Sequence, residues 1–159
     1  MADPALDELD RCIVYRLQGN ARKTSASTIA EEMNVAASTV RNRIRRLEDR
    51  GIIEGYNLDV NYEAAGFQLH TLIVCTAAIP ERERLAREAL EIEGVVAVRE
   101  VMTGSENVHV EVVGVDGDDL SRIGRELDAL GLDVVDEDII RSEYVNPYEG
   151  FAPDGANDE

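Results

Sequence analysis

The side chains best suited to bind a ligand lie in one short stretch of this sequence, residues 38–51, which holds five arginines and one asparagine. An arginine guanidinium can donate two hydrogen bonds to the O6 and N7 atoms of guanine, and an asparagine amide can pair with N6 and N7 of adenine. Serine and threonine hydroxyls suit phosphate oxygens or base edges. The side chains here that could contact DNA in these ways are Ser38, Thr39, Arg41, Asn42, Arg43, Arg45 and Arg46.

The spacing of the apolar residues within this stretch predicts the helix that presents these side chains. Val40, Ile44 and Leu47 recur at positions i, i+4 and i+7, which places one apolar stripe on a helix. The first turns of such a helix meet base edges when it enters a major groove, whereas Arg45 and Arg46 lie further along, nearer to phosphates. The alternative is a solvated helix face held by salt bridges between these arginines and nearby carboxylates.

Two shorter helices are predicted before this stretch. The first begins after Asp7 as N-cap and ends at residues 19–20, and the second begins after Ser25 as N-cap and ends at Asn34. Only a few residues separate the second helix from the basic helix, so the two must cross sharply, as in a helix-turn-helix. Three residues could hold the DNA backbone, although capping is as good a role for the serine: Arg22, Lys23 and Ser25.

The second half of the sequence alternates between strand and helix patterns. Strands are predicted at residues 69–78, 95–102, 108–115 and 132–145, and helices at residues 81–93 and 118–130. This βαββαβ order is the ferredoxin-like arrangement, an antiparallel sheet with both helices on one face. The predicted fold class is α+β, with an N-terminal helix-turn-helix domain of the winged-helix-like kind and a C-terminal ferredoxin-like domain. The first strand is apolar at both parities, so its second face needs a partner, and we expect a dimer formed through the sheets.

The charge of the chain is unevenly distributed. The 159 residues have a formal net charge of −17, yet residues 1–60 carry only −1 and residues 61–159 carry −16. The basic helix is therefore not a by-product of the overall composition. An acidic surface with a single lysine is typical of a protein from a salt-rich cytoplasm, such as that of a haloarchaeon, although it also suits any acidic, soluble protein.

These patterns divide the chain into four segments. Residues 1–52 form the helix-turn-helix domain, residues 53–67 a linker strand and hinge, and residues 68–145 the βαββαβ domain. Residues 146–159 contain two prolines and four acidic residues with little to bury, which predicts a flexible acidic tail.

Other chemistry has little support in the residue types present. Cys12 and Cys75 lie far apart within apolar segments, which indicates buried free thiols in a reducing compartment rather than a disulfide or a zinc site. His70 and His109 fall on neighbouring strands, so a shared metal site is one interpretation, but a polar cross-sheet contact with Glu111 is the better one. No P-loop, dinucleotide fingerprint, nucleophile elbow or HExxH motif occurs, so we predict no enzyme, no cofactor and no metal.

No segment is predicted to enter a membrane. No apolar run approaches the roughly 18 residues of a transmembrane helix, and no signal peptide is evident. We therefore expect a cytoplasmic protein without a membrane partner.

With these residues in place, the sequence resembles the Lrp/AsnC, or feast/famine, family of transcription regulators over nearly its whole length. The resemblance is carried by LDELDRCIVYRLQGNAR (residues 6–22), IAEEMNV (29–35), STVRNRIRRLEDRGIIEGY (38–56) and the turn at Thr103 and Gly104. One departure is Ala36, because the family usually has a serine N-cap at this position.

The resemblance implies a partner, an assembly and an effector. It implies a regulator that binds double-stranded DNA as a homodimer, or as a tetramer or octamer, with the linker strand and the C-terminal domain forming the dimer. That domain would also sense an amino acid or another small molecule, and the residues assigned to this role are Thr103, Gly104, Ser105, Glu106 and Asn107. The alternatives are an enzyme similar to siroheme decarboxylases, which share the two-domain plan, and a sensor or assembly module without DNA binding.

Overall fold

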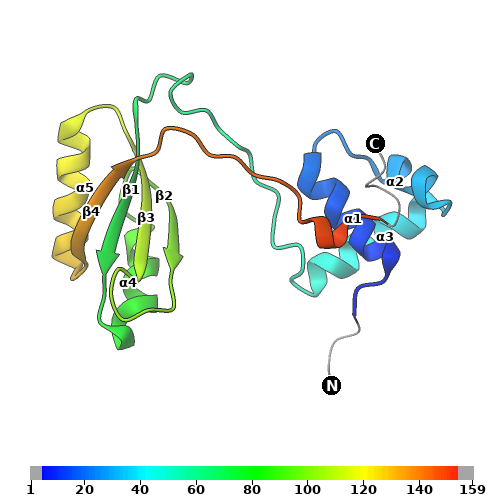
Figure 1. Cartoon of the computed structure of the whole chain (residues 1–159), viewed down its shortest axis with the longest axis horizontal. Coiled ribbons are helices and arrows are strands. Elements are labelled where there is room, and N and C mark those ends of the chain that lie inside the picture. The colour runs from blue at the N-terminus through cyan, green and yellow to red at the C-terminus, as the bar shows by residue number, and fades with distance from the viewer. Residues whose placement is uncertain (1–4, 154–159) are drawn as a thin grey trace. The chain divides into compact units, whose positions relative to one another are not determined.

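The structure, a computed structural model, describes residues 5–153, which form two compact units (Figure 1). The first unit, the helical domain, combines residues 5–58 with residues 144–153. The second unit, the sheet domain, consists of residues 59–143. The chain therefore passes between the two domains twice, before and after the sheet domain. Within residues 5–153, no helix has the length and apolar character needed to cross a membrane.

The helical domain contains the three predicted helices, which are α1 (Glu8–Asn20), α2 (Ala26–Met33) and α3 (Ala37–Asp49). The predicted N-caps are confirmed, because Asp7 accepts a hydrogen bond from Asp10 N–H at 2.9 Å and Ser25 accepts one from Thr28 N–H at 3.1 Å. Asn34 ends α2 in the left-handed conformation, with φ 52°, which asparagine tolerates better than most residues. The chain reverses here, and the predicted helix-turn-helix is confirmed.

The three helices pack around one small apolar core. Its buried members are Cys12, Ile13, Val14, Ile29, Ala30, Val40 and Leu47. Ile44 packs against this core while remaining partly buried, so all three residues of the predicted stripe on α3 face inward. The opposite side of α3 is left to solvent.

The sheet domain consists of four antiparallel strands and two helices. The strands are β1 (Leu69–Thr76), β2 (Val95–Glu100), β3 (Val108–Gly114) and β4 (Asp133–Ile139), in the order β2-β3-β1-β4. The helices are α4 (Arg82–Ala89), which follows the 3-10 turn η1 (Ile79–Glu81), and α5 (Gly117–Leu130). Ile73 and Val110 are buried with Leu85 of α4 and Leu127 of α5, as a ferredoxin-like fold requires. We call the sheet face turned away from the helices the open face.

Several observed elements are shorter than predicted. The last strand ends at Ile139 rather than at residue 145, and α4 ends at Ala89 rather than at residue 93. The predicted linker strand is absent from the described chain, since no residue between Asp49 and Leu69 is in a strand. An isolated extended segment has no neighbouring strand to satisfy its backbone hydrogen bonds.

The C-terminal segment differs from the predicted flexible tail. Residues Glu149–Phe151 form a 3-10 turn, η2, and Phe151 packs against the core of the helical domain. Its aromatic ring supplies apolar surface to bury, which the acidic composition of residues 146–159 conceals. The part of the predicted tail beyond residue 153 lies outside the described residues.

Both cysteines are free and fully buried, as predicted. Burial raises the pKa of the Cys75 thiol to about 11 and also raises the pKa of the Cys12 thiol. Thiols held in the neutral form are poor nucleophiles and poor metal ligands. The two cysteines therefore act as small apolar residues of the two cores.

Candidate nucleic-acid interface

One side of α3 presents polar and cationic side chains to solvent. Because Val40 and Leu47 fix the opposite side in the core, the helix cannot turn this side inward. The exposed residues are Ser38, Thr39, Arg41, Asn42, Arg45 and Arg46. None of these six side chains has a hydrogen-bond or ion-pair partner within residues 5–153. Their hydrogen-bond donors and positive charges are available to an anionic ligand.

Arg43 is engaged inside the helical domain. Its Nη1 atom lies 2.6 Å from Asp7 Oδ2 and 2.9 Å from Asp10 Oδ1, so it pairs with two carboxylates at the start of α1. The Arg43 side chain is 27% exposed and that of Asp10 only 2%. The Arg43 guanidinium therefore links α3 to α1 in this structure, and its assignment to DNA binding stays a prediction.

The pairing shifts the ionisation of both partners. The hydrogen bonds to Asp7 and Asp10 raise the pKa of Arg43 above its ordinary value. Burial alone would raise the pKa of Asp7, but the hydrogen bond from Asp10 N–H and the contact with Arg43 together lower it below 3.8. Both groups therefore carry opposite charges at neutral pH, which favours the link between α1 and α3.

The first turn of α3 has no side-chain cap, as the sequence indicates. Ala36 has the extended backbone of an N-cap residue, with φ −74° and ψ 143°, but no side-chain oxygen. Thr39 N–H donates instead to the backbone oxygen of Ala36 at 3.0 Å. A capless helix start is less stable, and its N–H groups can donate to a phosphate oxygen.

The three residues predicted to hold the DNA backbone lie between the end of α1 and the start of α2. Arg22 and Lys23 are exposed, and in the described chain their side chains have no hydrogen-bond or ion-pair partner. Ser25 Oγ accepts from Thr28 N–H and lies 2.8 Å from Thr28 Oγ1. Its observed role is capping, which the sequence left as an equal alternative.

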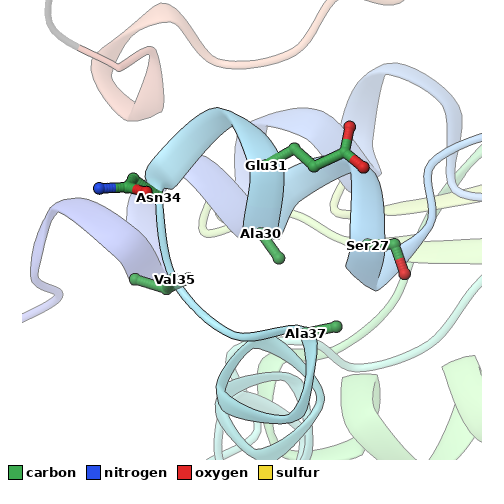
Figure 2. A pocket seen from close by; sticks show the side chains of 6 residues that line it. All are labelled: Ser27, Ala30, Glu31, Asn34, Val35 and Ala37. Atoms are coloured by element: carbon green, nitrogen blue, oxygen red, sulfur yellow. The ribbon is translucent and has the colours of Figure 1, made fainter.

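A hollow of about 420 Å³ lies between α2 and the start of α3 (Figure 2). The residues that line it are Ser27, Ala30, Glu31, Asn34, Val35 and Ala37. The small side chains of Ala30 and Ala37, on the two helices that border it, leave this space open (Figure 2). Glu31 is the one ionisable residue of the lining, so the hollow offers no acid–base pair for catalysis.

The turn between β2 and β3, assigned to effector binding, is pinned to the end of β1. Asn107 is fully buried, accepting from Ala77 N–H at 2.8 Å and donating to Ala77 O at 2.9 Å. Glu106 N–H donates to Thr76 Oγ1 at 2.8 Å, and Glu106 has a left-handed backbone with φ 51°. The Asn107 amide is therefore committed to the fold, whereas residues 103–105 are exposed.

A polar cluster lies on the open face of the sheet. His70 Nε2 is 2.6 Å from Glu111 Oε1, which confirms the predicted cross-sheet contact, and Arg99 Nη1 is 3.5 Å from the other carboxylate oxygen. The Tyr62 ring centroid lies 5.0 Å from that of His70. His109 instead contacts a backbone carbonyl oxygen, and in residues 5–153 no three His, Cys, Asp or Glu side chains are grouped to hold a metal.

Comparisons with known proteins point in the same direction as this geometry. A family model described as winged helix-turn-helix DNA-binding matches residues 6–54. An uncharacterized HTH-type transcriptional regulator of Pyrococcus abyssi is 34% identical over 117 residues, which cover 74% of this chain and 78% of the relative. The HTH-type transcriptional regulator LrpA of Pyrococcus horikoshii is 32% identical over 120 residues, which cover 74% and 82%.

Solved structures extend the similarity to both domains. A feast or famine regulatory protein from M. tuberculosis, complexed with L-methionine, is 28% identical with a TM-score of 0.73. The match covers 89% of this chain and 96% of that one. The order of a helix-turn-helix followed by a ferredoxin-like domain is thus shared along the chain.

Proposed function

The chain belongs to the Lrp/AsnC family of helix-turn-helix transcription regulators, and we propose that it reads a specific DNA sequence with α3 while assembled as a dimer or a larger oligomer. Its two domains are those of a DNA-binding regulator. Residues of α3 contact the bases and phosphates, the sheet domain forms the assembly, and a small molecule bound to that domain controls it.

The unpaired cations of α3 are the observation that carries the proposal. Arg41, Arg45 and Arg46 have no ion-pair partner within residues 5–153, although the chain has 33 acidic residues and a net charge of −17. Three unpaired arginines on one side of a single helix form a local positive surface in an otherwise acidic chain, and such a surface attracts an anionic ligand. Arg41 and Asn42 lie in the first two turns, where an inserted helix meets base edges, and the later arginines suit phosphates.

Two further segments support assembly into a dimer. Leu72 and Val74 of β1 and Val113 of β3 lie on the open face and are only half-buried. A second copy packed on this face would remove their apolar surface from water. Residues 53–60 could pair with the same segment of a second copy, which would satisfy the backbone groups of the predicted linker strand. Tetramers or octamers would then form from such dimers.

An amino acid or a related small molecule is the effector class that the relatives support. The M. tuberculosis relative is complexed with L-methionine. In this chain the exposed residues of the β2–β3 turn, Thr103, Gly104 and Ser105, are free to bind such a ligand, with Glu106 beside them. A thermal-shift screen of amino acids tests this, because a ligand that binds the folded state raises the melting temperature.

The acidic composition supports a protein that works in concentrated salt, in the cytoplasm where its DNA target lies. Binding that depends on phosphate neutralisation weakens steeply as salt rises. Base contacts and DNA shape must then supply more of the affinity. No residue arrangement in the described chain favours an enzyme, and mixing the protein with a tetrapyrrole should leave the tetrapyrrole absorbance spectrum unchanged.

Selection from a pool of random DNA duplexes tests the proposed function. The full-length protein, at molar KCl and at low salt, should enrich one sequence family, and footprinting should show protection over it. Arg87→Ala removes an exposed arginine of the sheet domain and is the control for arginine substitutions in α3. It should enrich the same sequence family as the unsubstituted protein. Enrichment of no sequence by a folded protein at either salt concentration would refute the proposal.

A further inference from the structure

The last described segment of the chain belongs to the helical domain rather than to the sheet domain that precedes it. Phe151 packs against the helical core, and Tyr148 N–H donates to Gln18 Oε1 of α1 at 3.3 Å. The Tyr148 and Phe151 rings meet edge to face, with centroids 5.1 Å apart. Figure 1 shows η2 beside α1. We call residues 147–151 the clasp.

Side chains of the clasp lie close to two glycines, Gly19 of α1 and Gly150 of the clasp itself. At Gly19, near the end of α1, an added Cβ would lie 3.6 Å from Pro147 Cγ, so the proline packs directly on the helix. At Gly150 an added Cβ would lie 2.5 Å from the Tyr148 ring, closer than real Cβ atoms approach. A side chain at position 150 would therefore displace the Tyr148 ring from its place in the clasp. An aromatic ring packed against the core, a hydrogen bond from Tyr148 N–H to Gln18 and a proline packed on the helix at Gly19 together indicate a specific contact.

We propose that the α1 surface around Gln18 and Gly19 is a docking site for the clasp of the same chain, and that docking gives the DNA-binding domain a second attachment to the sheet domain. The first attachment is the linker after α3, and the second is the segment of residues 140–146 after β4. The regulatory consequence rests on the proposed function, whereas the docking itself does not.

A second attachment changes how the helical domain can move. A domain held by one flexible linker samples a wide range of orientations, and a second tether removes most of them. In a dimer the two α3 helices would then be held near one separation, and half-sites at that separation would be bound together. A ligand that shifts the end of β4 would also act on α1 directly through residues 140–146.

An engineered disulfide tests whether the clasp of the same chain occupies this site. The variant carries Gly19→Cys and Pro147→Cys, and the native Cys12 and Cys75 are fully buried. Mild oxidation of the full-length protein should close an intramolecular disulfide, seen as a faster-migrating monomer on a non-reducing denaturing gel. The matched control pairs Gly19→Cys with Tyr144→Cys, because Tyr144 is 91% exposed and lies outside the clasp, and it should cross-link much more slowly. A dimer band, or equal rates for the two pairs, would overturn the proposal.

Release of the clasp tests its consequence for DNA. On duplexes carrying two selected half-sites, the wild type should lose about tenfold or more in affinity when the spacing changes by about 5 base pairs, half a helical turn. Phe151→Ala should reduce this loss to about threefold or less. Gly150→Ala disturbs the clasp without removing the core ring and should act in the same direction. If both folded variants keep the full spacing dependence, the second attachment has no role in DNA binding.

The two proposals fail in different ways. If no duplex is selected, the proposed function is wrong, and the disulfide experiment still reports on the clasp. If the selected duplex binds but the disulfide does not form, the clasp is wrong and the DNA-binding function stands.

Discussion

Arg43 of α3 donates a hydrogen bond to Asp10 of α1 across 2.9 Å, and the Asp10 side chain is only 2% exposed. A buried carboxylate is tolerated in a small core because the Arg43 guanidinium, which also pairs with Asp7, supplies the opposite charge. The same contact fixes the position of α3 on α1. Arg43 is thus a positioning residue in the middle of a helix whose neighbouring arginines face solvent.

Removal of Arg43 should destabilise the helical domain. Arg43→Ala leaves Asp10 buried without its partner, and we expect a loss of about 2 kcal/mol in the free energy of unfolding. Arg45→Ala, on the exposed side of the same helix, should change it by less than about 0.5 kcal/mol. Urea unfolding followed by circular dichroism at fixed KCl measures both. Equal stability of the two variants would show that the cluster has no structural importance.

The pairing of Asp7 with Arg43 should make stability depend on pH in the acid range. The folded-state pKa of Asp7 lies below the ordinary value of 3.8, so between those two values the native state binds fewer protons than the unfolded state. The contribution is complete above about pH 5 and is lost as the pH falls through the folded-state pKa. Because the Asp7 side chain is 50% exposed, we expect less than about 1 kcal/mol.

The matched variant for this prediction is Asp7→Asn, which keeps an N-cap oxygen and loses the charge. The wild type should be more stable than Asp7→Asn at pH 7, and the difference should shrink towards pH 3. A difference in unfolding free energy that stays constant over this range would contradict the assignment.

Asn107 should be essential to the sheet domain although it lies in a turn. Asn107→Ala leaves the N–H and C=O of Ala77 without their partner, which costs about 1–3 kcal/mol in unfolding free energy. Ser105→Ala, in the exposed part of the same turn, should have an effect below about 0.5 kcal/mol. Chemical unfolding of the two variants measures the contrast. If Asn107→Ala changes the unfolding free energy only slightly, the Asn107 amide is not needed for the fold and could serve ligand binding instead.

The missing cap of α3 offers a stabilising substitution. Ala36 already has N-cap backbone geometry, so the hydroxyl of Ala36→Thr can accept from the N–H of Thr39 and should add about 0.5–1 kcal/mol. Ala36→Val has nearly the same shape and no hydroxyl, and should add nothing. Thermal unfolding of the pair separates the cap from side-chain bulk, and equal melting temperatures would exclude a capping effect.

The helix ends and the buried side of α3 were predictable, because they depend on residues close together in the sequence. Asp7, Ser25 and Asn34 act on residues within one helical turn, and the apolar stripe of α3 fixes which side of that helix is buried. The alternating strands and helices of the second half likewise specify their own faces. This local information was sufficient for the helix-turn-helix and for the ferredoxin-like order.

Features set by contacts distant in sequence were not predictable in the same way. Arg43 meets carboxylates more than thirty positions away, and nothing in its own stretch distinguishes it from Arg41 or Arg45. Asn107 is likewise fixed by Ala77 of another strand end. The docking of Phe151 depends on a site on α1 that no periodicity signals.

In the proposed complex with DNA, the first turns of α3 read bases while its later arginines hold phosphates. The most direct measurement compares binding of Arg41→Ala and Arg45→Ala to the selected duplex and to its single-base variants over a range of KCl concentrations. Arg41→Ala should flatten the preference at one base pair by about 1–3 kcal/mol, whereas Arg45→Ala should weaken all duplexes alike and lower the salt slope by about one. If Arg41→Ala weakens every duplex equally and no base preference changes, α3 does not read the sequence as proposed.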